Sequence, residues 1–212
     1  MKVSRTRTAA HRSPYDSRNA EITRLANNLY QKGCFPGGSG SISLVVNRSP
    51  FRILITPSSF KKFEKGDGLL IDQCGVPVRS AGEKISGEVK THIAIYEKIM
   101  DASCVIHPHS LNSLLTADRS GSEVIFKGFE VLKAFGIKEK DGSLKIPIID
   151  NTYDKDERAR MVTEALLQGS PAVIIRRHGM FVYGKSMDEA RQRTELLEFL
   201  MEYNLRETAK SV

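Results

Sequence analysis

Two histidines separated by one residue, His107 and His109, could provide the ligands of a metal site. They follow a short apolar run at residues 103–106 that is typical of a strand, and residues two apart on a strand point to the same face. Both imidazoles can then reach one ion, with Pro108 stiffening the turn between them. The alternative is that either histidine is a polar surface residue or a hydrogen-bonded core residue.

A third histidine strengthens the metal hypothesis. His178 follows a run typical of a buried strand, residues 172–177, and precedes Gly179, at which the backbone can turn sharply. Three imidazole ligands leave one coordination position open, which is typical of a catalytic metal rather than a structural one. We therefore expect His107, His109 and His178 to bind one metal ion.

Two glutamates are candidates for the acid or base of a reaction. Glu88 lies at the start of a predicted helix over residues 87–101, and His92 lies one turn further along, so both could reach a common site. Glu88 is either a metal ligand or general base, or a solvated acid that the helix dipole favours in a first turn. Glu130, in the run KGFE, also enters a helical stretch, where the solvated acid is again the simpler interpretation.

Three segments carry groups that suit a phosphate. The run GGSGS at 37–41 offers backbone N–H groups, TPSS at 56–59 adds hydroxyls before Lys61 and Lys62, and Lys84 precedes the Glu88 helix. Glycine-rich turns more often serve geometry alone, and a single lysine is more often ordinary surface charge. The candidate phosphate-binding residues are Ser39, Gly40, Ser58, Lys84 and Ser86.

Alternating helices and strands must position these residues. Hydrophobic spacing predicts helices over residues 14–33, 87–101 and 155–168, and a last helix after the capping box of Ser186 and Glu189. Amphipathic stretches at 111–117 and 126–135 add further helical candidates. Strands are expected at residues 41–46, 51–56, 69–72, 103–106, 144–149, 172–177 and 181–183.

The order of these elements predicts an α/β protein with a single-domain, layered α/β/α fold. Its central sheet should be mixed and largely antiparallel, because residues 47–50 join two short strands as a hairpin and the connection from residue 177 to 181 is tight. No GxGxxG turn follows a first strand, so nucleotide binding is disfavoured. We expect a basic N-terminal arm at residues 1–18 and one domain at residues 19–212.

Composition limits the setting of the protein. The chain has 212 residues, 40% hydrophobic and 27% charged, which is ordinary for one globular domain. It lacks an apolar run of bilayer length and an apolar secretory segment, and its three cysteines show no paired spacing, so we expect a cytoplasmic protein that does not bind membranes. The net charge of +7 is compatible with phosphorylated substrates; without a nucleic-acid motif, no nucleic-acid partner is expected.

Much of the positive charge lies in the N-terminal arm, where Lys2, Arg5, Arg7 and Arg12 precede the first acid, Asp16. An arm rich in Arg and Ser and poor in acids resembles an organellar transit peptide. The alternative, which we favour, is that the arm packs on a neighbouring subunit.

Five segments, in this order, are similar to the class II aldolase/adducin family: GGSGSIS, ITPSS, KISGEVKTHIAIY, VIHPHS and IIRRHGMFVYG. The order spans about residues 20 to 205. Three further stretches, FKGFEVLKAF, IPIIDNTYDKDERARM and IIRRHGMFVYGKSMDEAR, most resemble the dehydratases of this family that act on 5-methylthioribulose 1-phosphate.

The resemblance implies a cyclic homotetramer with active sites between neighbouring subunits, and one zinc ion per subunit on the three histidines. It further implies that Glu130 is the catalytic acid/base. Glu88 occupies the position of the catalytic acid of the sugar-phosphate aldolases, whereas some similar dehydratases have a cysteine there. The motif His107-Pro108-His109 replaces the HTH of many relatives and keeps both ligands.

The implied activity is the zinc-dependent dehydration of 5-methylthioribulose 1-phosphate to 2,3-diketo-5-methylthiopentyl 1-phosphate in methionine salvage. The alternative is a class II sugar-phosphate aldolase of the fuculose or rhamnulose phosphate type, which uses the same metal chemistry to cleave a carbon–carbon bond. A non-catalytic module of the adducin kind would be expected to lose the histidines, and all three remain.

Overall fold

The computed structural model describes residues 14–58, 68–78, 82 and 84–209. The positive residues of the N-terminal arm up to Arg12 lie outside the described residues, as do Lys61 and Lys62. The first helix begins at Pro14, so residues 14–18 of the expected arm belong to it.

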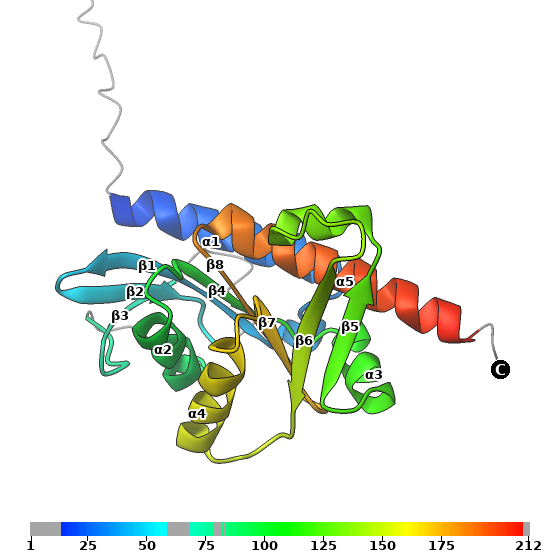
Figure 1. Ribbon diagram of the computed structural model, residues 1–212. Helices are drawn as coiled ribbons and strands as arrows, with labels where there is room; N and C mark the ends of the chain where they lie inside the picture. Colours follow the sequence, from blue (N-terminus) through cyan, green and yellow to red (C-terminus); the bar gives the residue numbers. More distant parts are fainter. Residues whose placement is uncertain (1–13, 59–67, 79–81, 83, 210–212) are drawn as a thin grey trace, which may run out of the picture.

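A mixed sheet forms the centre of the molecule, as the sequence predicted (Figure 1). Within the described residues its order is β3-β2-β1-β4-β8-β7-β6-β5, and every neighbouring pair is antiparallel except β6 and β7. The strands are β1 (Ser41–Arg48), β2 (Phe51–Ile55), β3 (Leu69–Asp72), β4 (Cys104–His107), β5 (Glu123–Lys127), β6 (Ser143–Ile149), β7 (Ala172–Ile175) and β8 (Gly179–Gly184).

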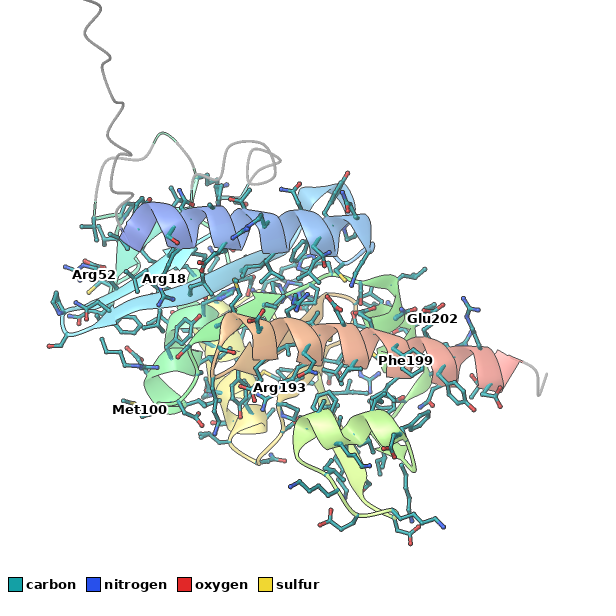
Figure 2. The ribbon with its side chains drawn as sticks, turned by 90° about the horizontal axis from the view of Figure 1, so that it is seen from above. Arg18, Arg52, Met100, Arg193, Phe199 and Glu202 are labelled. Atoms are coloured by element: carbon teal, nitrogen blue, oxygen red, sulfur yellow. The ribbon has the colours of Figure 1, made fainter. Side chains whose placement is uncertain are left out.

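Helices cover both faces of the sheet, which confirms the α/β/α layering. Helices α1 and α5 cover one face, where Figure 2 shows them side by side, and α2 and α4 cover the other (Figure 1). The α-helices are α1 (Pro14–Gln31), α2 (Val89–Lys98), α3 (Leu111–Arg119), α4 (Lys155–Leu166) and α5 (Met187–Ala209), and the short 3-10 helices are η1 (Pro36–Gly38) and η3 (Glu130–Phe135).

The strands bury alternate side chains under the two helical layers. On β4, Val105 packs in the cluster that includes Ile93 of α2 and Val162 of α4. The flanking residues Cys104 and Ile106 pack in the cluster beneath α1. Because successive side chains of a strand point to opposite faces, such near-continuous apolar strands require a helix layer on each side.

The segment before β6 differs from its predicted structure. The amphipathic stretch at 126–135 was expected to be helical, but residues up to Lys127 form β5, with Val124 and Phe126 buried on one face. Gly128 then turns the chain at a φ of 78°, and a 3-10 helix follows from Glu130. The alternation was present in the sequence, but the partly exposed Ile125 obscured its period of two.

The predicted capping box of α5 forms in modified geometry. The backbone N–H of Glu189 donates to Ser186 Oγ at 3.1 Å, as expected. The Glu189 carboxylate, however, accepts from the backbone N–H of Lys185, one residue earlier than the standard motif.

Among the described residues, no helix is both long enough and apolar enough to cross a membrane.

Candidate metal centre and active site

Two neighbouring strands at the middle of the sheet bring the three histidines together. His107 is the last residue of β4, and His178 immediately precedes β8, which pairs antiparallel with β4. The end of one strand therefore lies against the beginning of the other. The N–H of Met180 donates to Pro108 O at 3.0 Å, which fastens the start of β8 to the residue between the two ligands.

Imidazole nitrogens of all three histidines converge on one point. The Nε2 atoms of His107 and His109 are 2.8 Å apart, and one ring nitrogen from each of the three histidines lies within 4.8 Å of the others. Around a tetrahedral ion with metal–nitrogen distances of 2.0–2.1 Å, ligand nitrogens are about 3.3 Å apart. The observed cluster brackets that spacing, so the residues fit a metal ion after small adjustments.

Hydrogen bonding and burial prepare His107 to act as a ligand. Its Nδ1–H donates to Met180 O at 2.8 Å, which leaves the Nε2 lone pair directed at the cluster. The ring is fully buried and stacks on Phe181 at a centroid distance of 4.0 Å. Burial, reinforced by the two neighbouring histidines, lowers the pKa of His107 well below its usual value. The neutral imidazole that results is the form that binds metals.

His178 also has the properties of a ligand. Its Nδ1 atom is buried and has no hydrogen-bond partner among the described residues, a situation that a folded protein rarely leaves uncompensated. Burial lowers the pKa of His178, although the nearby Glu88 carboxylate acts in the opposite direction.

His109 reaches the cluster by a different route from the one predicted. It was expected to lie on the strand with His107, but β4 ends at His107 and His109 follows in the loop. The N–H of His109 donates to Cys34 O at 2.9 Å, so the segment after α1 holds this loop in place. The two rings still meet at a centroid distance of 4.6 Å.

Glu88 lies beside the histidines. It is the N-cap residue of α2, and its Oε1 is 3.9 Å from Nε2 of His178. Its Oε1 also accepts a hydrogen bond of 2.5 Å from Nη1 of Arg158, and its Oε2 accepts one of 3.4 Å from Thr91 Oγ1. Of the two acids chosen from the sequence, Glu88 is the one that lines the same cavity as the three histidines.

Arg158 is a residue of the site that the sequence reasoning missed. It lies on α4 and is only 6% exposed. A signal was present in the sequence, because Arg158 occupies the same helical stripe as the buried residues Val162 and Ala165. A charged residue on a buried stripe needs a partner, and that need could have pointed to a buried acid.

His92 does not contribute to the cluster, although the sequence suggested that it could share a site with Glu88. It is fully buried, and its two ring nitrogens hydrogen-bond to Ser41 Oγ at 2.8 Å and Ser43 Oγ at 2.7 Å. Burial lowers the pKa of His92 to about 3. Its role is that of a neutral core residue.

The histidines and Glu88 line a cavity of about 400 Å³, together with most of the residues chosen for phosphate. These are Ser39, Gly40, Ser58 and Ser86, joined by Gly37, Gly38 and Gly87. Lys84 is not among the lining residues; it is exposed, and its carbonyl accepts from the N–H of Ser58 at 2.9 Å. The 3-10 turn η1, the strand end after β2 and the N-terminus of α2 therefore meet opposite the histidines.

Glu130 lies apart from the histidines within one chain. It begins η3, its side chain is 81% exposed, and it forms an ion pair with Lys133 one turn later. Glu130 does not line the cavity that contains the three histidines.

Two known enzymes are similar in sequence to most of this chain. Methylthioribulose-1-phosphate dehydratase of Bacillus subtilis (strain 168) is 34% identical over 191 residues, covering 88% of this chain and 91% of that protein. The enzyme of the same name from Persephonella marina (strain DSM 14350 / EX-H1) is 33% identical over 179 residues, covering 82% and 83%.

Solved structures of low sequence identity show the same fold. An L-fuculose 1-phosphate aldolase superposes with a TM-score of 0.75 at 22% identity, covering 94% of this chain and 90% of that one. The L-fuculose-1-phosphate aldolase of Thermus thermophilus gives a TM-score of 0.71 at 20% identity, covering 92% and 97%. The family profile described as Class II Aldolase and Adducin N-terminal domain matches residues 20–205. The chain therefore belongs to the class II aldolase and adducin family.

Proposed function

We propose that the protein dehydrates 5-methylthioribulose 1-phosphate to 2,3-diketo-5-methylthiopentyl 1-phosphate, as a cytoplasmic enzyme of methionine salvage. The observation that carries the proposal is the convergence of three imidazoles and one carboxylate on a cavity of about 400 Å³, a size that suits a small phosphorylated sugar. Similarity to dehydratases named for this substrate, over most of the chain, supports the choice of reaction.

Zinc is the proposed metal, held by His107, His109 and His178. All three ligands are nitrogen donors, and the sites of this kind that zinc uses for catalysis have three protein ligands and one open position. When bound, zinc would supply a Lewis acid that stabilises negative charge on the substrate as the C3 proton leaves.

Glu130 is the proposed acid/base, supplied by a neighbouring copy in a homotetramer. Two features support this assignment. Glu130 is exposed on η3, and the adjacent Phe129 packs against Tyr203 of α5 at a ring distance of 5.1 Å. Phe199 of α5 (Figure 2) and Tyr203 of the same helix are large apolar residues that are 51% and 45% exposed, which suits a surface that a second subunit covers.

In the proposed reaction the C3 proton passes to the Glu130 carboxylate. The C4 hydroxyl then leaves as water after accepting a proton from the same acid or through a bound water. The remaining enol becomes the second ketone of the product. The substrate phosphate is proposed to contact the hydroxyls of Ser39, Ser58 and Ser86 and the N–H of Gly40, with Lys84 contributing positive charge from the edge.

The test is mass spectrometry of the product formed from methylthioribulose 1-phosphate by zinc-loaded protein. A product lighter by one water supports the proposal, and Glu130→Gln should abolish it. Glu164→Gln is the matched control, because Glu164 is an exposed acid paired with an arginine of its own helix, as Glu130 is paired with a lysine. Unchanged substrate with the wild type would refute the function, and full activity of Glu130→Gln would refute the role of Glu130.

A second candidate function is sugar-phosphate aldolase. The position of Glu88, with Oε1 3.9 Å from His178 Nε2, favours it, because an acid beside the metal could serve carbon–carbon cleavage equally well. The same experiment with fuculose 1-phosphate and rhamnulose 1-phosphate distinguishes the two. Two carbon fragments would establish the aldolase, whereas loss of water with the carbon chain intact excludes it for that substrate.

A further inference from the structure

Glu88, which lines the cavity, forms an ion pair with Arg158, which does not line it. Their side chains are 14% and 7% exposed, which makes them the most buried pair of a carboxylate and a guanidinium among the described residues. Such a pair loses much of its hydration, and further hydrogen bonds to the two groups offset part of that cost.

The guanidinium is fixed from a second direction. Its Nη2 donates to the carbonyl of Thr152, in the loop before α4, while its Nη1 donates to Glu88. Arg158 therefore links α4 and its preceding loop to Glu88, the N-cap residue of α2. Because the planar guanidinium has little freedom once two of its nitrogens are bound, it imposes a position on the carboxylate.

The same oxygen of Glu88 faces both Arg158 and the three histidines. Oε1 is 2.5 Å from the arginine nitrogen and 3.9 Å from Nε2 of His178. The group whose ligand atoms all lie within 4.8 Å of one another contains the three histidines and not Glu88. The Glu88 oxygen that lies near His178 is thus hydrogen-bonded to the arginine.

We propose that Arg158 is a positioning residue that holds Glu88 beside the three histidines and prevents it from becoming a fourth metal ligand. The coordination position that substrate needs then stays open, while the carboxylate remains within reach of substrate. The inference deepens the proposed function and rests on it for the metal, but it does not depend on which sugar phosphate is the substrate.

The first experiment measures metal binding rather than activity. Zinc affinity is determined by chelator competition, and the cobalt-substituted protein gives an absorption spectrum that depends on the number and type of ligands. Arg158→Gln should change the cobalt spectrum and tighten zinc binding by about tenfold or more, because the released carboxylate joins the ligands. In Arg158→Gln combined with Glu88→Gln, both changes should disappear.

Glu88→Gln alone tests the inference even if Arg158→Gln does not fold. Glutamine has the same shape and can still accept from Arg158, so the variant should keep the wild-type cobalt spectrum. A spectrum that reports a lost ligand would mean that Glu88 binds the metal in the wild type, which overturns the proposal. A change caused by Arg158→Gln that persists in the double variant would also overturn it.

Lys90→Gln is the matched control for loss of an ion pair between the same helices. Lys90 of α2 binds Asp156 of α4 at 2.7 Å on the surface, away from the cavity. This variant should leave both zinc affinity and the cobalt spectrum unchanged, and an effect as large as that of Arg158→Gln would overturn the proposal.

Kinetics provide the final readout. Arg158→Gln should lower kcat by about tenfold or more with KM changed by less than about threefold, and should have no further effect in the Glu88→Gln background. Additive losses would indicate that Arg158 acts independently of Glu88 and would refute the proposal. An inactive wild type would refute the proposed substrate alone, because the metal-binding results would still stand.

Discussion

Replacing Gly179 by alanine should disturb the metal centre without touching a ligand. Gly179 has a φ of 155°, which residues with a side chain rarely adopt. A Cβ built there would lie 2.3 Å from Pro108 O and 2.9 Å from Cδ2 of His109. Both neighbours belong to the segment that carries the ligands, and the first is backbone that cannot rotate away. The added methyl must therefore displace either β8 or the His109 loop.

The expected loss of stability combines two terms. Overpacking costs about 1–3 kcal/mol, and an unfavourable backbone conformation costs about 1–3 kcal/mol, so the free energy of unfolding of the metal-free protein should fall by about 2–6 kcal/mol. Gly169→Ala is the matched control. Gly169 has a φ of 90° with nothing within 4 Å of an added Cβ, so it should show the backbone term alone.

Urea denaturation with and without zinc measures both consequences. At a zinc concentration of about 100 times the wild-type Kd, wild type should gain about 2.7 kcal/mol. A variant that binds about ten times more weakly, as a displaced ligand would cause, should gain only about 1.4 kcal/mol. Gly169→Ala should gain as much as wild type. Equal destabilisation of the two variants, with equal gains from zinc, would refute the view that close packing of β8 on Pro108 positions the ligands.

Three further results are expected. His178→Gln should weaken zinc binding by more than about 100-fold in chelator competition, because loss of a residue that only orients a ligand already costs about 10–100-fold. Wild-type zinc affinity of this variant would exclude His178 as a ligand. Because the pKa of His92 falls from an ordinary value of 6.5 to about 3 in the folded protein, its contribution to stability is present above pH 6.5 and declines as pH falls toward 3. About 2 kcal/mol should be lost by about pH 5, and urea denaturation of His92→Asn should show a correspondingly weaker pH dependence; equal pH dependence would contradict this. Ser186→Ala removes the acceptor for the N–H of Glu189 and should lower the free energy of unfolding by about 1 kcal/mol in urea, whereas an unchanged midpoint would show that the cap is dispensable.

Residue type and spacing were enough to select the three histidines and most of the cavity wall. His107 and His178 each follow a run that is typical of a buried strand, and strand ends of that kind often meet at one edge of a sheet. What spacing could not show is that β4 and β8 are direct neighbours, because the pairing of strands roughly 70 residues apart depends on the whole topology. The resemblance to the family implied only the three-histidine site, and the structure confirms the mixed sheet that the order of the elements predicted.

The roles of individual titratable and charged residues were harder to predict from the sequence. Glu88 and His92 are one helical turn apart, so the sequence suggested that both could reach one site. Glu88 lines the cavity, whereas His92 is buried against the serines of β1. The difference depends on where α2 begins and on the serines opposite His92, which only the folded structure brings together. Arg158 was missed for a similar reason, since its partner lies 70 residues away in the chain.

The central position of β4 and β8, fourth and fifth of the eight strands, has a consequence for engineering. Three strands lie between the metal centre and each edge of the sheet, or roughly 14 Å at the usual strand spacing. Tags, inserted loops or fused domains placed at β3 can alter that edge while the ligand geometry stays intact, whereas β5 leads directly into η3 and Glu130. The β3 edge thus provides an attachment point on a catalyst whose metal site need not be redesigned.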